Sequence, residues 1–380
     1  MPGQNTNTEF DSPRIVPSNE DRFARISEEY LKPNIGLLFL MTSHFFNSIM
    51  VVSTKLLETD PLLEEPIKPL QILVVRMFIT FIGTLIYMQL NKDKIPHVPF
   101  GPPEVRKWLI LRGFTGFFGV FGLYFSLMYL SVSDAVMITF LAPSFTGLLA
   151  WVILHERYSK IEALGGLVSL FGVILIVRPT FMFGAQSRTS SDESFESSDP
   201  RDRLVATLVS LLGVLGVSSV YIIIRYIGHR AHAIMSVTYF AFITCMISLF
   251  GILLIPSMTF QIPKTLKQWF LFFLIGISGF FMQLLLTLGI QRERAGRGAL
   301  MAYGQMIYAI FWDILIWHHP PGLWSLCGMT IIIASTVTVI KFKPKQEEAV
   351  INDEENGTQV YHMEDFEIDD DNEDSGQDPK

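Results

Sequence analysis

Residues 133–157 read SDAVMITFLAPSFTGLLAWVILHER, and this stretch decides the fold. Between Asp134 and Glu156 the residues are almost all apolar or small. A surface helix of a soluble protein would show a polar face repeating every 3.6 residues, and this stretch has none. The apolar core of a bilayer needs roughly 20 such residues for one helical span. The stretch therefore predicts a transmembrane helix.

The composition of the whole chain also indicates that lipid surrounds most of the fold. Half of the 380 residues are hydrophobic and only 17% are charged, with a mean hydropathy of +0.39. These values are typical of membrane proteins. The apolar runs cover residues 34–56, 70–90, 108–130, 134–154, 161–178, 204–224, 233–255, 269–290, 297–317 and 321–340. We predict an all-α polytopic membrane protein with ten transmembrane helices.

Charge is unevenly distributed along the chain. The net charge of −7 comes from the end, because residues 341–380 hold 14 acidic and four basic residues. The segments 1–33 and 342–380 have too little apolar surface to fold, so both are predicted to be disordered tails. The remaining basic residues lie in short loops, without the clustering of a nucleic-acid footprint. We expect no nucleic-acid partner.

The positions of lysine and arginine predict the orientation. If the N-terminus is cytosolic, the cytosolic segments hold nineteen of these residues and the opposite face holds eight. Cytosolic loops carry the excess of Lys and Arg in membrane proteins. The first 33 residues are polar and the first apolar run is too long for a signal peptide. We therefore predict cytosolic N- and C-termini, in an endomembrane or the plasma membrane.

One polar loop divides the chain into two blocks. Residues 179–203 are rich in serine and acidic residues, and they separate five apolar runs in 34–178 from five in 204–341. Because five is odd, the second block would enter the membrane from the opposite side. Secondary transporters use such inverted repeats for alternating access. The sequence therefore predicts two inverted five-helix repeats joined by an extracytosolic loop.

Two stretches resemble a known family. Residues 123–176, LYFSLMYLSVSDAVMITFLAPSFTGLLAWVILHERYSKIEALGGLVSLFGVILI, are similar to the first repeat of the EamA branch of the drug/metabolite transporter superfamily. Residues 288–313, LGIQRERAGRGALMAYGQMIYAIFWD, resemble fungal members related to nucleotide-sugar carriers. The second repeat departs from the pattern at His318-His319-Pro320-Pro321, and no proline there matches Pro143. The resemblance implies a transporter of small molecules.

Pro143 interrupts the fourth apolar run. Proline lacks a backbone N–H and frees a carbonyl in a helix, which must find a partner in protein or in cavity water. Neighbouring hydroxyls at Thr139, Ser144 and Thr146 are suitable partners. We expect Pro143 to kink the helix. The kinked helix either lines a central cavity or serves only the packing between spans.

Charged residues within apolar runs need a reason, because burying them in hydrocarbon is costly. Arg76, Lys55 and Asp313 are all predicted near the extracytosolic face. One interpretation is an ion pair between Arg76 and Asp313 that joins the two blocks. Another makes Arg76 or Lys55 an anchor for an anionic substrate, and Lys55 is also placed to reach the interface. An unpaired cation would favour an anionic or zwitterionic metabolite over a lipophilic cation.

Polar uncharged residues in the runs are further candidates for substrate binding or gating. A histidine in the middle of a span is able to relay a proton, although His44 equally fits a packing role. Hydrogen bonds between helices explain the others equally well. The candidates are His44, Asn47, Tyr124, Gln283, Tyr303 and Gln305.

The function predicted from these patterns is transport by alternating access. The chain shows none of the P-loop, HExxH or G-x-S-x-G motifs of common enzyme classes. We expect no catalytic residues, no metal site and no cofactor. The expected partners are the lipid bilayer, a small-molecule solute, a coupling proton or counter-substrate, and a second copy in a homodimer. A channel or a non-transporting membrane scaffold remains the alternative.

Overall fold

The computed structural model describes residues 32–58, 67, 69–93, 95–127, 129–130, 138–156, 159–177, 200–254, 260–318 and 323–342. Within these ranges the regular secondary structure is helical, and they contain no strand. Residues 1–31 and 343–380 of the predicted tails and residues 179–199 of the predicted loop lie outside the described residues, whereas residues 32–33 and 200–203, predicted as tail and loop, belong to helices. The described residues up to Val339 belong to one compact unit.

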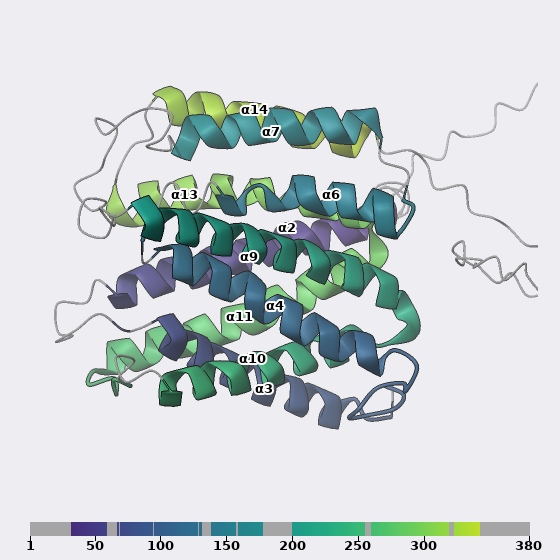
Figure 1. Cartoon of the computed structure of the whole chain (residues 1–380), viewed down its shortest axis with the longest axis vertical. Coiled ribbons are helices and arrows are strands. Elements are labelled where there is room, and N and C mark those ends of the chain that lie inside the picture. Colours follow the sequence, from purple (N-terminus) through teal and green to yellow (C-terminus); the bar gives the residue numbers. More distant parts are fainter. Residues whose placement is uncertain are drawn as a thin grey trace, which may run out of the picture. The chain divides into compact units, whose positions relative to one another are not determined.

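A described helix lies in each of the ten predicted apolar runs (Figure 1). The helices of the first block are α2 (Lys32–Glu58), α3 (Pro69–Leu90), α4 (Arg106–Leu127), α6 (Ala142–Ile153) and α7 (Lys160–Val177). Those of the second block are α9 (Pro200–Ile227), α10 (Ala233–Leu254), α11 (Leu266–Arg292), α12 (Ala295–Leu300), α13 (Gln305–Trp317) and α14 (Leu323–Lys341). Two 3₁₀ turns, η3 (Gly228–Arg230) and η4 (Met301–Gly304), interrupt the second block.

Six helical segments in the described part are long and apolar enough to cross a membrane. They are Asn34–Leu57, Leu70–Leu90, Leu204–Arg230, Ala233–Leu254, Leu266–Arg292 and Ala295–Ile316. Two shorter helical segments, Ala142–Ile153 and Leu326–Lys341, are also apolar. The prediction of an all-α polytopic membrane protein is therefore confirmed.

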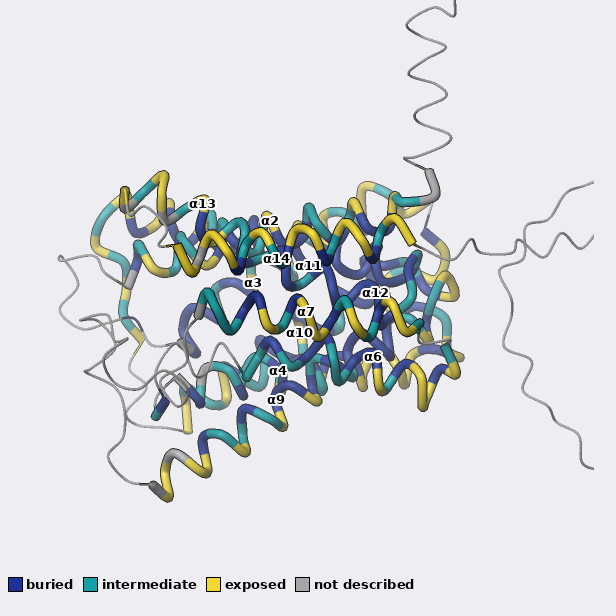
Figure 2. Tube along the Cα trace, turned by 90° about the horizontal axis from the view of Figure 1, so that it is seen from above, coloured by how far each residue is buried: buried dark blue, intermediate teal, exposed yellow. Residues whose placement is uncertain are grey.

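The exposed sides of the helices are apolar, as lipid requires. Figure 2 shows exposed positions alternating with buried ones along the helices. Many of these exposed positions carry large hydrophobic side chains, including Phe250, Leu253 and Leu254 on α10 and Leu164 on α7. In water such a surface would drive aggregation, whereas acyl chains solvate it at no cost.

Glycines allow α4 and α9 to cross at very short range. A Cβ atom added to Gly122 would lie 2.6 Å from Cα of Gly213 and 3.0 Å from the carbonyl oxygen of Val209. At Gly216 it would lie 2.8 Å from the carbonyl oxygen of Thr115. Small residues promote helix association in lipid by letting backbones approach. The glycines of α4 and α9 thus have a packing role.

Gly122→Ala is expected to destabilise the protein by about 1–3 kcal/mol, because the new methyl group meets backbone atoms that cannot rotate away. Gly251→Ala on α10 is the matched control, since its Cβ would meet only the side-chain Cδ1 of Leu70, at 3.3 Å. Thermal unfolding in detergent micelles measures both variants. Equal unfolding temperatures would contradict the role of the close crossing.

The remaining helices pack around α11 and at one edge of the bundle. Gly289 on α11 faces Leu40 of α2, and Ser43 donates a hydrogen bond of 2.8 Å to the carbonyl oxygen of Met282. Helices α7 and α14 lie side by side (Figure 1), and Ser335 donates to the carbonyl oxygen of Gly165 at 2.7 Å. Neighbouring backbones are thus joined by small residues and hydroxyl groups.

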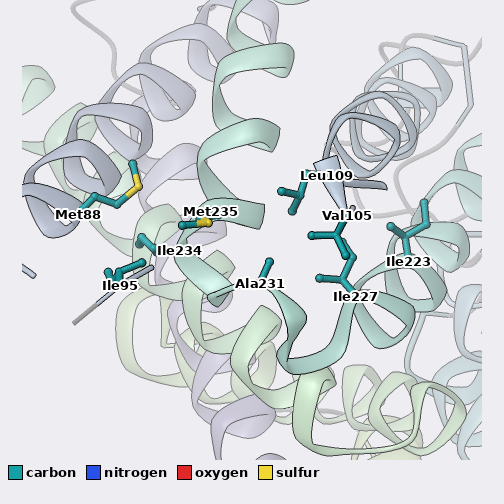
Figure 3. Close-up of a cluster of buried hydrophobic side chains, with 9 residues drawn as sticks. All are labelled: Met88, Ile95, Val105, Leu109, Ile223, Ile227, Ala231, Ile234 and Met235. Atoms are coloured by element: carbon teal, nitrogen blue, oxygen red, sulfur yellow. The ribbon is translucent and has the colours of Figure 1, made fainter. Parts of the chain in front are cut away.

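A separate apolar cluster closes the end of the bundle where α3 and α9 finish and α4 and α10 begin (Figure 3). Its side chains come from four helices and from the segments that connect them. The members are Met88, Ile95, Val105, Leu109, Ile223, Ile227, Ala231, Ile234 and Met235. This cluster fixes the ends of the helices on the side that the distribution of Lys and Arg predicts to be cytosolic.

Candidate functional site: an internal cavity between the two blocks

A cavity of about 210 Å³ lies between helices of both blocks. Its walls are His44, Leu123, Thr139, Phe140, Ala142, Pro143, Thr146, Val217, Tyr221, Ala299, Ala302 and Gln305. The first seven belong to residues 34–178 and the last five to residues 204–341. The cavity therefore lies where the two sequence blocks meet.

On the first block, the cavity wall includes a break in the helix. Residues 140–141 form a turn, and α6 begins only at Ala142. Pro143 lies in the first turn of α6, where a missing N–H costs nothing and the fixed φ of proline suits the helix. The predicted kink is therefore a helix start. Ser218 of α9 donates a hydrogen bond of 3.2 Å to the carbonyl oxygen of Ala142, so a hydroxyl from another helix contacts this turn.

On the second block, the cavity wall includes a second irregular segment. The chain passes from α12 into the 3₁₀ turn η4 (Met301–Gly304) before α13 begins. A Cβ atom at Gly304 would have nothing within 4 Å, so open space faces this position. The ring of Tyr303, on η4, stacks on Phe140 with centroids 6.0 Å apart and planes at 18°. The two irregular segments thus contact each other.

Two residues of the cavity wall carry buried polar atoms without partners. His44 is 7% exposed and Thr146 is fully buried. Nε2 of His44 and Oγ1 of Thr146 have no hydrogen-bond partner among the described residues. A buried polar atom without a partner costs about 1–3 kcal/mol. A ligand or water in the cavity would supply the missing hydrogen bonds.

Beyond the cavity, an ion pair joins the blocks at the end of α6. Glu156 accepts a hydrogen bond of 3.0 Å from Nε of Arg225, at the end of α9. Its second oxygen accepts one of 3.1 Å from the backbone N–H of Ala295, at the start of α12. Burial raises the pKa of Glu156, and the neighbouring Arg225 opposes that rise. This glutamate therefore contacts two helices of the other block.

A buried triad lies next to that ion pair. Arg297 of α12 donates to Glu162 of α7 at 2.7 and 2.9 Å and to Glu293 at 2.8 Å. All three residues are at most 4% exposed. Sequence reasoning did not select Glu162 or Arg297, because it placed the ends of both apolar runs at the membrane surface. We call Glu156, Glu162, Arg225, Glu293 and Arg297 the inter-block ion cluster.

A second buried arginine was also missed from the sequence. Arg112 of α4 is 1% exposed. Nη2 donates to Oε1 of Gln283 on α11 at 2.8 Å, and the guanidinium lies 4.1 Å from the ring centroid of Phe240. Nε and Nη1 have no hydrogen-bond partner among the described residues. Arg112 is the fifth residue of the predicted run 108–130, and a charged residue inside an apolar run is a signal that could have identified it as a candidate.

The other predicted site residues lie elsewhere. Arg76 is buried against α11, where a Cβ at Gly279 would lie 2.8 Å from its Nε. Lys55 is exposed in the last turn of α2, and Asn47 is half-buried. None of these three is among the residues that line the cavity. The side chains of Tyr124 and Asp313 lie outside the described residues, so the predicted pair of Arg76 with Asp313 stays a prediction.

Comparison with known proteins identifies the family to which these two blocks belong. Residues 34–178 and 204–341 match the EamA-like transporter family. The chain belongs to that family. As an EamA-like transporter it is an integral, multi-pass membrane protein, and the resemblance stated from its sequence is confirmed.

Three relatives of this EamA-like transporter illustrate the family. The "Uncharacterized membrane protein YMR253C" of Saccharomyces cerevisiae is 60% identical over 93% of this chain and 87% of its own length. The "Probable transport protein YPL264C" of the same yeast is 57% identical over 90% of this chain and 99% of its own length. "Solute carrier family 35 member G1" of Homo sapiens is 32% identical over 62% of this chain and 63% of its own length.

Proposed function

We propose that the chain carries a small organic metabolite across a membrane by alternating access, with ten spans arranged as two inverted five-helix repeats. The observation that supports this most is the composition of the cavity wall. Residues of α2, α4 and α6 face residues of α9, α12 and α13 across it. A site at the interface of two repeats becomes accessible from either side when one repeat rocks against the other.

The helix breaks support the same mechanism. The turn at 140–141 and the 3₁₀ turn η4 lie in the fourth and ninth apolar runs, which are the fourth runs of the two blocks. Transporters with inverted repeats bind their substrate at discontinuous helices near the middle of the membrane. Irregular backbone at that depth is tolerated only where protein or a cavity satisfies it.

The inter-block ion cluster would then close one end of the pathway. Its residues lie where α6, α9 and α11 end and α7 and α12 begin, and Arg297 is two residues from the cavity-lining Ala299. The distribution of lysine and arginine assigns this end to the cytosol, together with both termini. Opening toward the cytosol would require these ion pairs to separate.

The size and chemistry of the cavity favour a small substrate. Its volume of about 210 Å³ lies below the roughly 300–1,000 Å³ of sites for drug-sized ligands. Alanine, leucine, phenylalanine and valine supply much of the wall, and His44, Tyr221 and Gln305 supply polar groups. We propose an anionic or zwitterionic metabolite with a small apolar body, recognised by His44 in place of the predicted Arg76 or Lys55.

Counterflow in proteoliposomes tests the transport mechanism. The proteoliposomes are loaded with an unlabelled solute identified by an untargeted uptake screen. Entry of the same solute in labelled form is then followed. Wild-type protein is expected to show transient accumulation, which a carrier produces and a channel does not. Ala302→Phe fills the cavity and is expected to reduce counterflow at least about tenfold, because the side chain occupies the substrate site.

Ala334→Phe is the matched control, since Ala334 is exposed on α14 and its side chain would face lipid. Its counterflow is expected to equal that of the wild type. Flux without counterflow would identify a channel, and no flux of any solute would favour the scaffold alternative. Equal counterflow by Ala302→Phe and wild-type protein would show that the substrate does not use this cavity.

A further inference from the structure

The position of His44 in the cavity has a consequence for the chemistry of the ligand. His44 lies near the middle of α2, about 18 Å along the helix from Lys32 at 1.5 Å per residue. It lines the cavity, it is 7% exposed, and its Nε2 has no hydrogen-bond partner among the described residues. One titratable nitrogen atom in the cavity wall therefore has an unused hydrogen-bonding capacity inside the membrane.

The walls around this nitrogen carry no formal charge. The described residues lining the cavity include no Asp, Glu, Lys or Arg, and Tyr221 of α9 is the other titratable side chain in that set. At the end of α11, which packs against α2, Arg292 and Glu293 lie beside Gly36, two helical turns before His44. On α13 the acidic residue is Asp313, two turns after Gln305, and its side chain lies outside the described residues.

An anion cannot enter such a cavity alone without a large desolvation penalty. An imidazolium in an apolar cavity has the same difficulty, because burial disfavours the charged form. When both arrive together, each neutralises the other and forms a charge-assisted hydrogen bond. The cavity therefore favours the joint binding of one proton and one anionic group.

We infer that His44 takes up a proton together with a small organic monoanion, with Nε2 donating the resulting N–H to a carboxylate oxygen. This inference rests on the proposed function and names its coupling ion. The proton comes from the solution on the side of entry, so the net charge entering the cavity is zero. Release on the other side returns the neutral imidazole, and the anion and the proton cross together.

Thr146 and Gln305 complete the recognition of the anion. Oγ1 of Thr146 is buried and unpartnered, and its hydroxyl is a donor for the second carboxylate oxygen. Gln305 lies on the opposite wall, at the start of α13. The apolar remainder of the wall, including the stacked Phe140, receives the body of the ligand.

Binding of benzoate and of benzamide to the full-length protein in detergent micelles tests the inference. The two probes share a ring and differ in charge. Isothermal titration calorimetry between about pH 5.5 and 7.5 spans the range in which an ordinary histidine titrates. We expect benzoate to bind about tenfold or more tightly at the lower pH, and the affinity for benzamide to be independent of pH.

Repeating the titration in buffers of different ionisation enthalpy counts the protons directly. Wild-type protein is expected to take up about one proton for each benzoate at the higher pH. His44→Asn and His44→Gln are expected to abolish both the uptake and the pH dependence while still binding benzamide, which shows that the cavity is folded. His155→Asn is the matched control, because His155 is exposed and its φ of 51° suits asparagine.

Three results would overturn the inference. These are benzoate binding without proton uptake, unchanged pH dependence in both His44 variants, and no binding of either probe to wild-type protein. None of these results changes the expected outcome of the counterflow experiment, so the transport mechanism and the role of His44 are tested separately.

Discussion

Arg297→Met is expected to lower the free energy of unfolding by about 3–5 kcal/mol, the largest effect of any substitution proposed for this protein. Arg297 donates three hydrogen bonds to Glu162 and Glu293 at 2.7–2.9 Å, and neither glutamate is more than 4% exposed. Removing the guanidinium leaves two buried carboxylates without their shared partner. Thermal unfolding in detergent micelles, followed by circular dichroism, measures the loss.

Two further variants separate charge from geometry. Arg297→Lys keeps the charge but loses the planar fork that reaches both carboxylates, so an intermediate loss is expected. Lys107→Met removes an exposed cation at the start of α4 and should change stability by less than about 0.5 kcal/mol. If Arg297→Met unfolds at the wild-type temperature, the inter-block ion cluster does not hold the two blocks together.

Gln283→Leu is expected to destabilise the protein by about 1.5–3 kcal/mol, the loss of a hydrogen bond to a charged group. Among the described residues, Gln283 is the hydrogen-bond acceptor of the Arg112 guanidinium, at 2.8 Å, in a site where Arg112 is 1% exposed. After the substitution the guanidinium keeps only its contact with the Phe240 ring. Among the described residues, no carboxylate lies within ion-pair distance of Arg112.

Arg112→Met is expected to destabilise the protein less than Gln283→Leu does. It removes the buried charge together with its desolvation penalty, and the remaining loss comes from the neutral Gln283 amide, which is left without this partner. The double variant Arg112→Met with Gln283→Leu should therefore be more stable than Gln283→Leu alone. Unfolding of the three variants in mixed micelles forms a double-mutant cycle. A larger loss for Arg112→Met than for Gln283→Leu would contradict this account.

The sequence by itself determined that the chain lies in a lipid bilayer, that its fold is all-α and that it belongs to the EamA-like family. Runs such as 134–154 and 233–255 have no polar face, and ten such runs in 380 residues are typical of a membrane protein, so composition and length were sufficient. The family followed from local features, including Asp134-Ala135, Pro143 and Glu156-Arg157. Each of these signals is contained in a short stretch of chain and needs no partner from elsewhere.

Only the tertiary structure decided which residues meet. Arg112 and Gln283 are 171 residues apart, and Glu162 and Arg297 are 135 apart, so no local pattern relates them. His44 and Gln305 were selected from sequence for their depth, but the shared cavity became visible only when helices of both blocks were in place.

Pro143 shows the same limit of the sequence. Its missing N–H was evident, yet whether it kinks or starts a helix depends on the turn at 140–141 and on Ser218, which α9 supplies. A side chain's depth follows from its position in an apolar run, whereas its partners follow from the packing of helices distant in sequence.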